Sequence, residues 1–107
     1  MLDEATYSGL VSSVFKRLVA AADQIDPDVL DCDSTGDMVT FTSPAGGKVV
    51  VNTQRAVKQI WVAGKSQGIH FSWDGKSWLD DKGKGLEVFA WVSECVEAAC
   101  GKPLTYE

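Results

Sequence analysis

The spacing of hydrophobic residues changes twice along this chain, and that change limits the folds it can adopt. From Thr6 to about 26–27, and again after Gly85, hydrophobic side chains recur every three or four residues, which indicates amphipathic helices. The stripe of the first helix is Leu10, Val14, Leu18, Ala21 and Ile25. The stripe of the second is Leu86, Phe89, Val92, Val96 and Ala99, and Gly101 closes that helix.

Between the two helical patterns, short runs rich in β-branched and aromatic residues are separated by turn residues. The predicted strands cover 29–34, 38–42, 48–53, 59–63, 69–73 and 77–79. Their connections are too short for parallel crossovers, so we expect an antiparallel meander of about six strands. Two helices that flank such a meander can both cover one of its faces. The sequence therefore predicts a single α+β domain over 1–107, a two-layer sandwich whose other sheet face is solvated.

Alternation within the predicted strands assigns side chains to the two faces of the sheet. The face expected beneath the helices carries Val39, Phe41, Ile60, Val62, Ile69, Phe71 and Trp73. The solvated face carries Thr40, Gln59, Trp61, His70 and Ser72. A tryptophan among amides on a solvated sheet is typical of an anchor for a protein partner, and the alternative is a ring covered by a loop. We expect Trp73, Trp78 and Trp91 to be structural and His70 to lie at the surface.

The negative charge of the chain is concentrated in its first third. Residues 1–37 hold eight acidic and two basic residues, whereas residues 38–107 hold seven acidic and eight basic residues, and the net charge is −5. This charge repels phosphate backbones, so we expect no nucleic-acid partner. No hydrophobic run approaches the roughly 20 residues of a membrane span, and the first residues lack the basic start of a secretory signal. We therefore expect a cytoplasmic protein without a membrane partner.

Five aspartates lie around the junction between the first helix and the first strand. They are Asp23, Asp26, Asp28, Asp31 and Asp33, hereafter the acidic ridge. Asp31 and Asp33 are two residues apart on a strand and leave the same face. Carboxylates at a helix C-terminus are unfavourable, so folding alone does not select them. Converging oxygens without sulfur or imidazole suit hard cations such as iron, magnesium, calcium or manganese.

Two other interpretations of the acidic ridge can be considered from the sequence. The first is a solvated acidic face that only keeps the protein soluble. The second is a calcium loop that begins at Asp26, but an EF-hand requires glycine at its sixth position and glutamate at its twelfth. Those positions hold Asp31 and Asp37, which excludes the EF-hand.

The central part of the chain resembles the signature of the frataxin family. The segments NTQRAVKQIWVA (52–63), GIHFSW (68–73) and WLD (78–80) match an N-x-Q strand end, a Q-[IV]-W-[LV]-[AS] strand, a glycine, an aromatic strand and a further tryptophan. Upstream, LDCD (30–33) and Gly36 are similar to the first strand of bacterial frataxins. The likeness extends over the strands and both helices, from about Thr6 to Pro103.

This resemblance implies a two-layer α/β sandwich and a role in iron–sulfur cluster assembly. It implies weak binding of ferrous and ferric iron by surface carboxylates, which places the metal on the acidic ridge. It also implies regulatory docking onto a cysteine desulfurase and its iron–sulfur scaffold protein, with Asn52, Gln54, Gln59 and Trp61 as the scaffold-binding positions. By the same likeness we expect a monomer, with self-association on iron as an open alternative.

The residues give no sign of an active site. The three cysteines show no C-x-x-C spacing and are expected to be reduced, and neither a nucleophile elbow nor a phosphate-binding loop is present. One histidine on a strand cannot build a di-iron oxidase of the bundle type. We therefore expect a protein that is not an enzyme, and the alternative is a ferroxidase-like protein that detoxifies or stores iron.

Overall fold

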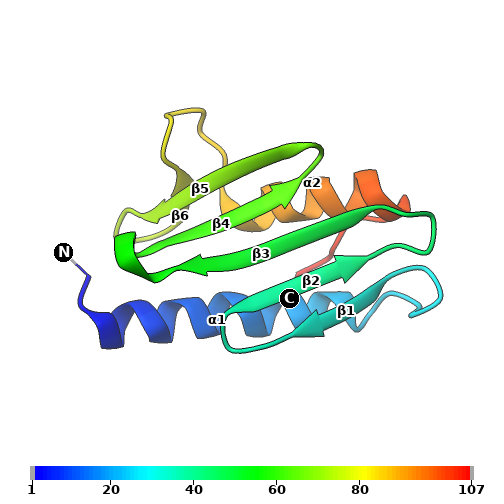
Figure 1. The fold of residues 1–107 in the computed structure, drawn as a ribbon, viewed down its shortest axis with the longest axis horizontal. Helices are drawn as coiled ribbons and strands as arrows, with labels where there is room; N and C mark the ends of the chain where they lie inside the picture. The colour runs from blue at the N-terminus through cyan, green and yellow to red at the C-terminus, as the bar shows by residue number, and fades with distance from the viewer. Residues whose placement is uncertain (1, 107) are drawn as a thin grey trace.

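The computed structural model describes residues 2–106 and has the predicted order of helix, strands and helix (Figure 1). Its helices are α1 (Glu4–Ala22), the 3-10 helix η1 (Arg55–Val57) and α2 (Val88–Cys100). Its strands are β1 (Asp31–Ser34), β2 (Met38–Thr42), β3 (Lys48–Gln54), β4 (Gln59–Gly64), β5 (Gln67–Trp73) and β6 (Trp78–Asp80). These strands form one antiparallel sheet in chain order, and α1 and α2 lie on the same side of it. The predicted two-layer α+β sandwich is confirmed.

The ends of the helices differ from the sequence prediction. Helix α1 ends at Ala22, four residues before the predicted boundary, and the chain then passes through turns to Leu30. In these turns the amide groups of Val29 and Leu30 both donate to the carbonyl oxygen of Asp26, which hydrophobic spacing cannot reveal. Helix α2 begins at Val88, because the Glu87 carboxylate caps it by accepting from the amides of Phe89 and Ala90. Gly101 ends α2 at a φ of 86°, as predicted.

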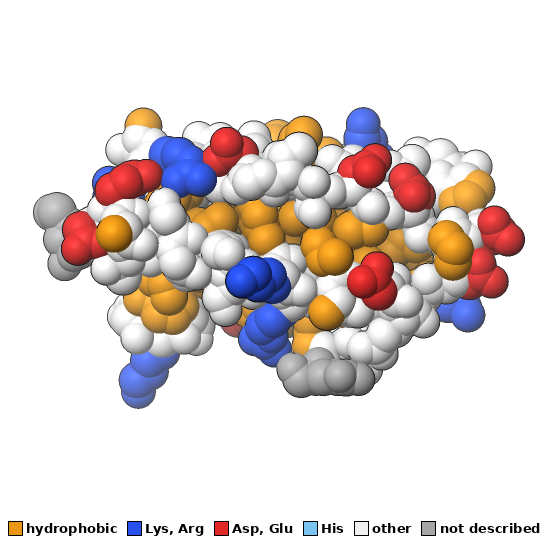
Figure 2. Space-filling view, turned by 90° about the horizontal axis from the view of Figure 1, so that it is seen from below, with side chains coloured by type: hydrophobic (Ala, Val, Ile, Leu, Met, Phe, Trp, Pro, Cys, Tyr) orange, Lys and Arg blue, Asp and Glu red, His pale blue; other side chains and the backbone are white. Residues whose placement is uncertain are grey.

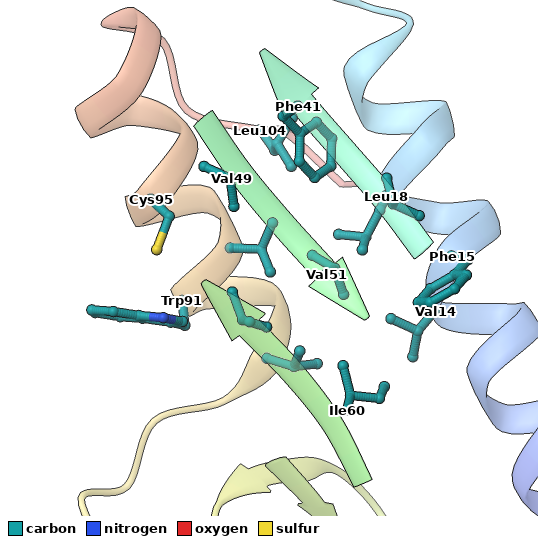
Figure 3. Packing of buried hydrophobic residues seen from close by; sticks show 14 of the residues in the cluster. Val14, Phe15, Leu18, Phe41, Val49, Val51, Ile60, Trp91, Cys95 and Leu104 are labelled. Carbon is teal, nitrogen blue, oxygen red and sulfur yellow. The ribbon is translucent and has the colours of Figure 1, made fainter. Parts of the chain in front are cut away.

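The hydrophobic core lies between the sheet and the two helices (Figure 3). The inward residues of the central strands are fully covered, and α1 and α2 add their own buried stripes. From the sheet these residues are Val39, Phe41, Val49, Val51, Ile60, Val62 and Phe71. Trp78 and Trp91 are buried, as expected, whereas Trp73 is half-buried at the end of β5 and packs against Trp78 with ring centroids 5.6 Å apart. Among residues 2–106, no helix or second sheet covers the face of the sheet opposite α1 and α2, hereafter the open face.

Helix α2 approaches the sheet closely because two glycines leave room for it. A Cβ atom at Gly64 would lie 2.7 Å from both Cβ and Sγ of Cys95, and one at Gly47 would lie 2.6 Å from Cβ of Ala99. Such distances are shorter than van der Waals contact, so either methyl group would push α2 away from the core.

Gly64→Ala is expected to lower the free energy of unfolding by about 1–3 kcal/mol, because the added methyl overpacks the contact with Cys95. Urea denaturation followed by circular dichroism measures this change. Gly9→Ala on α1 is the control for the added methyl: nothing lies within 4 Å of it there, and this variant should be at least as stable as the parent because alanine favours the helix. Equal stability of Gly64→Ala and the parent would contradict this close packing.

The loop between β6 and α2 is organised by one buried carboxylate. Asp80 accepts from the amides of Lys84 and Leu86 at 2.8 Å and of Lys82 at 3.3 Å. The bond from the Lys84 amide contributes most to holding the pKa of Asp80 below its ordinary value, and the other bonds act in the same direction. All of them favour the charged form of the carboxylate. The unfolded chain has the ordinary pKa of about 4. The stability due to Asp80 is therefore present above about pH 4 and is lost as the pH falls through the lower pKa of the folded state.

Asp80→Asn is expected to flatten the acid side of the stability profile, because the asparagine has no proton to gain. Urea denaturation at a series of pH values below about pH 5 measures this slope. Asp81→Asn, which removes an exposed carboxylate from the next position, is the matched control. The same slope in Asp80→Asn and the parent would show that Asp80 is not the titrating group.

Candidate functional site

The sheet brings the four predicted partner-binding residues together on the open face. Asn52 and Gln54 of β3 lie directly opposite Trp61 and Gln59 of β4, respectively. All four side chains are half-buried, and those of Asn52, Gln59 and Trp61 alternate with buried residues of their strands, as predicted. These two neighbouring cross-strand pairs form the amide–tryptophan patch (Asn52, Gln54, Gln59 and Trp61).

Side-chain and backbone hydrogen bonds hold the end of this patch in place. The amide of Gln59 donates to the Ser72 hydroxyl at 2.9 Å. The Tyr7 hydroxyl donates to the carbonyl oxygen of Gln59 at 2.7 Å and accepts from the backbone amide of Gln54 at 3.3 Å. The connection between β3 and β4 is thus tied to α1 through a fully buried tyrosine. Hydrophobic spacing placed Tyr7 within the first predicted helix but gave no signal for these bonds.

Trp61 lies on the open face, as predicted, but its ring is not free on all sides. The indole leans from β4 across to β5, where a Cβ atom at Gly68 would lie 2.8 Å from Nε1. Gly68 is the diagonal neighbour of Trp61, whose direct partner in the register is His70. His70 is half-buried, and its Nδ1 is shielded from solvent without a hydrogen-bond partner among the described residues. The expected surface position of His70 is therefore only partly correct.

The acidic ridge occupies the end of the molecule where α1 gives way to β1 (Figure 2). Asp31 and Asp33 are exposed on the edge strand β1, and their partners Thr42 and Thr40 place them on the open face. Asp23 caps α1, while Asp26 and Asp28 are exposed in the turns that follow. The Asp26 carboxylate accepts from the backbone amide of Asp28 at 2.9 Å.

Ion pairs neutralise other acidic residues of the first third of the chain, but no ion pair of the described residues involves the acidic ridge. Arg55 contacts Glu4 at 3.2 Å and Asp37 at 2.8 Å, and Lys58 contacts Glu4 at 3.7 Å. Within residues 2–106, no aspartate of the acidic ridge has a basic partner within 4 Å. The negative charge of the acidic ridge acts on the half-buried Cys32. Burial, together with Asp23, Asp31 and Asp33, raises the pKa of its thiol to about 11.

The carboxylates of the acidic ridge do not form a preformed chelate. Among the residues that the structure describes, no group of three histidine, cysteine, aspartate or glutamate side chains is placed to hold one metal ion. No three of the five predicted ligands therefore meet at one point among the described residues. A two-residue step along an extended strand places the Cα atoms of Asp31 and Asp33 roughly 6–7 Å apart, and the other three aspartates lie at the end of α1 and in the turns that follow. Such a surface suits a hydrated cation held by one or two carboxylates.

The structure combines an acidic helix–strand junction with an amide-rich open face, on a sheet covered by two helices. These features define a class of small α+β proteins. The chain matches the family model of the frataxin-like domain over residues 1–102. The chain belongs to the frataxin-like family.

Curated relatives and solved structures agree with this assignment. A protein of Albidiferax ferrireducens is 35% identical over 96% of each chain, and one of Tolumonas auensis is 31% identical over 97% of this chain and 98% of the relative. Both bear the name iron-sulfur cluster assembly protein CyaY. The frataxin of Psychromonas ingrahamii has the same fold, with a TM-score of 0.87 at 18% identity and 99% coverage of each chain.

A trimeric frataxin from the yeast Saccharomyces cerevisiae, solved in a complex with ferrous iron, is also similar in fold. Its TM-score is 0.69 at 23% identity, and the match covers 95% of this chain and 89% of the yeast chain. Within the described part of the chain, no helix has the length and apolar character needed to cross a membrane.

Proposed function

We propose that this protein acts in iron–sulfur cluster assembly as an iron-binding regulator without an active site of its own. The observation that carries the proposal is the acidic ridge, whose five aspartates are left without basic partners by the rest of the described chain. Its relatives, which match nearly the whole chain and are named for iron–sulfur cluster assembly, support the same role. We place this role in the cytoplasm.

Iron is proposed to bind weakly on the acidic ridge. Hard oxygen ligands suit ferrous and ferric ions, and the absence of a three-ligand group in the described residues favours an ion that keeps most of its water. The yeast frataxin complexed with ferrous iron has the same fold and supports iron as the cation. An open surface of this kind has little selectivity among hard cations.

The protein partners are proposed to be a cysteine desulfurase and the iron–sulfur scaffold protein. The acidic ridge suits a basic patch on the desulfurase, and the amide–tryptophan patch suits the scaffold. Asp33 lies in one cross-strand row of the open face with Thr40, Val50, Ala63 and Gly68, and the Trp61 indole of the amide–tryptophan patch leans over Gly68 at the end of this row. One assembled partner complex can therefore contact both surfaces from the same side.

The test of this function is the effect of the protein on purified cysteine desulfurase with its scaffold. We expect a change in the rate of sulfide release and cluster formation that depends on the amount of protein added. A ferroxidase-like protein would instead consume oxygen with turnover when ferrous iron is added to it alone. Partner binding that is unchanged by chelators would indicate a metal-independent adaptor.

Titration with ferrous iron under anaerobic conditions is expected to perturb the acidic ridge first. Amide signals of residues 23–33 in NMR spectra should shift or broaden before those of Asp74 and Asp81, which are exposed carboxylates elsewhere. Size-exclusion chromatography of the same samples tests whether the monomer self-associates on iron. First responses outside the acidic ridge would show that iron binds at another site.

A further inference from the structure

The indole of Trp61 and the bare backbone of Gly68 form one structural unit on the open face. In the antiparallel pair of β4 and β5, Ala63 is the direct partner of Gly68, and His70 is the direct partner of Trp61. Trp61 therefore reaches its diagonal neighbour, which lies within range of a large aromatic ring. A Cβ atom at position 68 would lie 2.8 Å from Nε1, 3.0 Å from Cζ2 and 3.1 Å from Cε2 of the indole.

This contact explains why position 68 holds glycine. The backbone conformation at that position does not require it. Gly68 lies in β5 and does not have the positive φ seen at Gly46, Gly75 and Gly101. Its backbone conformation is therefore open to alanine, and the three atoms nearest to an added Cβ all belong to the ring of Trp61. Glycine within a strand commonly marks such a close approach.

We infer that Gly68 is a positioning residue for partner binding: it lets the Trp61 indole lean across β5 and sets the orientation in which the ring meets the partner. This inference rests on the proposed role of Trp61 in the amide–tryptophan patch. A tryptophan anchor contributes most when its ring is already held in the bound orientation, because less side-chain entropy is lost on binding. With a methyl group at position 68, the ring must lift or rotate away from β5.

The alternative is that the pair only stabilises the sheet, since an aromatic ring over a strand glycine shields backbone that would otherwise be bare. The two roles differ in what Gly68→Ala changes. A purely structural pair would alter the thermal midpoint and leave partner affinity intact. If Gly68 is a positioning residue, Gly68→Ala lowers partner affinity only when Trp61 is present.

The experiment combines NMR with a double-mutant cycle. In Gly68→Ala we expect one of the four indole N–H signals, assigned to Trp61 by its absence in Trp61→Ala, to shift. Affinity for the purified desulfurase–scaffold complex should fall about tenfold. In the Trp61→Ala background, Gly68→Ala should cause no further loss. Gly9→Ala, which adds the same methyl to an open position on α1, should match the parent in both measurements.

Three results would overturn the inference: an unchanged Trp61 indole signal in Gly68→Ala, a partner affinity of Gly68→Ala equal to that of the parent, or a loss of affinity that persists when Trp61 is absent. Failure of the proposed function has a different signature, because Trp61→Ala alone would then bind the complex as tightly as the parent. Circular dichroism of every variant confirms that the comparison is made between folded proteins.

Discussion

Trp61→Ala is expected to weaken binding to the desulfurase–scaffold complex by about thirtyfold, the loss typical of a central aromatic anchor. The ring lies between Asn52 and His70 in the register of the open face, where it can offer a large contact area. Its removal should lower the thermal midpoint only slightly, because the side chain is half-buried and lies outside the core. Isothermal titration calorimetry and thermal denaturation measure the two effects.

Trp73→Ala is the matched control, since Trp73 is also half-buried but lies on the helix side of the sheet and packs against Trp78. It should lose stability and keep its affinity for the complex. If Trp61→Ala instead melts many degrees below the parent and binds normally once folded, Trp61 is a structural residue.

The double variant Asp31→Asn, Asp33→Asn is expected to weaken both iron binding and desulfurase binding by about tenfold at low salt. Both carboxylates are exposed on the edge strand β1, and neither has a basic partner among the described residues. The difference from the parent should shrink as salt is added, because exposed charges are screened within about 10 Å at 0.1 M ionic strength. Without metal, the variant should be at least as stable as the parent, because repulsion between carboxylates is relieved.

Glu94→Gln with Glu97→Gln provides the same change of net charge on the exposed side of α2. This control should bind iron and the desulfurase as the parent does.

We also expect iron and the desulfurase to compete, since both are proposed to use the acidic ridge. Equal affinities of the Asp31, Asp33 double variant and the parent at low salt would refute the role of the acidic ridge.

Much of the candidate site could be predicted because it depends on strand alternation. The period of two placed Trp61 and Gln59 opposite to the buried Ile60 and Val62, and it placed Asp31 and Asp33 on one face. Element ends were predicted less well: β1 begins two residues later and β5 two residues earlier than predicted, and local hydrogen bonds set the helix ends. Helix α1 stops at Ala22 although its hydrophobic spacing continues to Ile25, which lies in a turn.

The sequence by itself determined the helix–meander–helix order, the two faces of the sheet and the concentration of acidic residues in the first third, because each follows from spacing or composition along the chain. Only the tertiary structure decided which of those acidic residues are neutralised, since Arg55 reaches Glu4 across 51 positions of sequence. It also decided that the carboxylates stay apart and that Trp61 rests over Gly68. The physical reason is that ion pairs and ring contacts depend on strand register and helix packing, and spacing along the chain specifies neither.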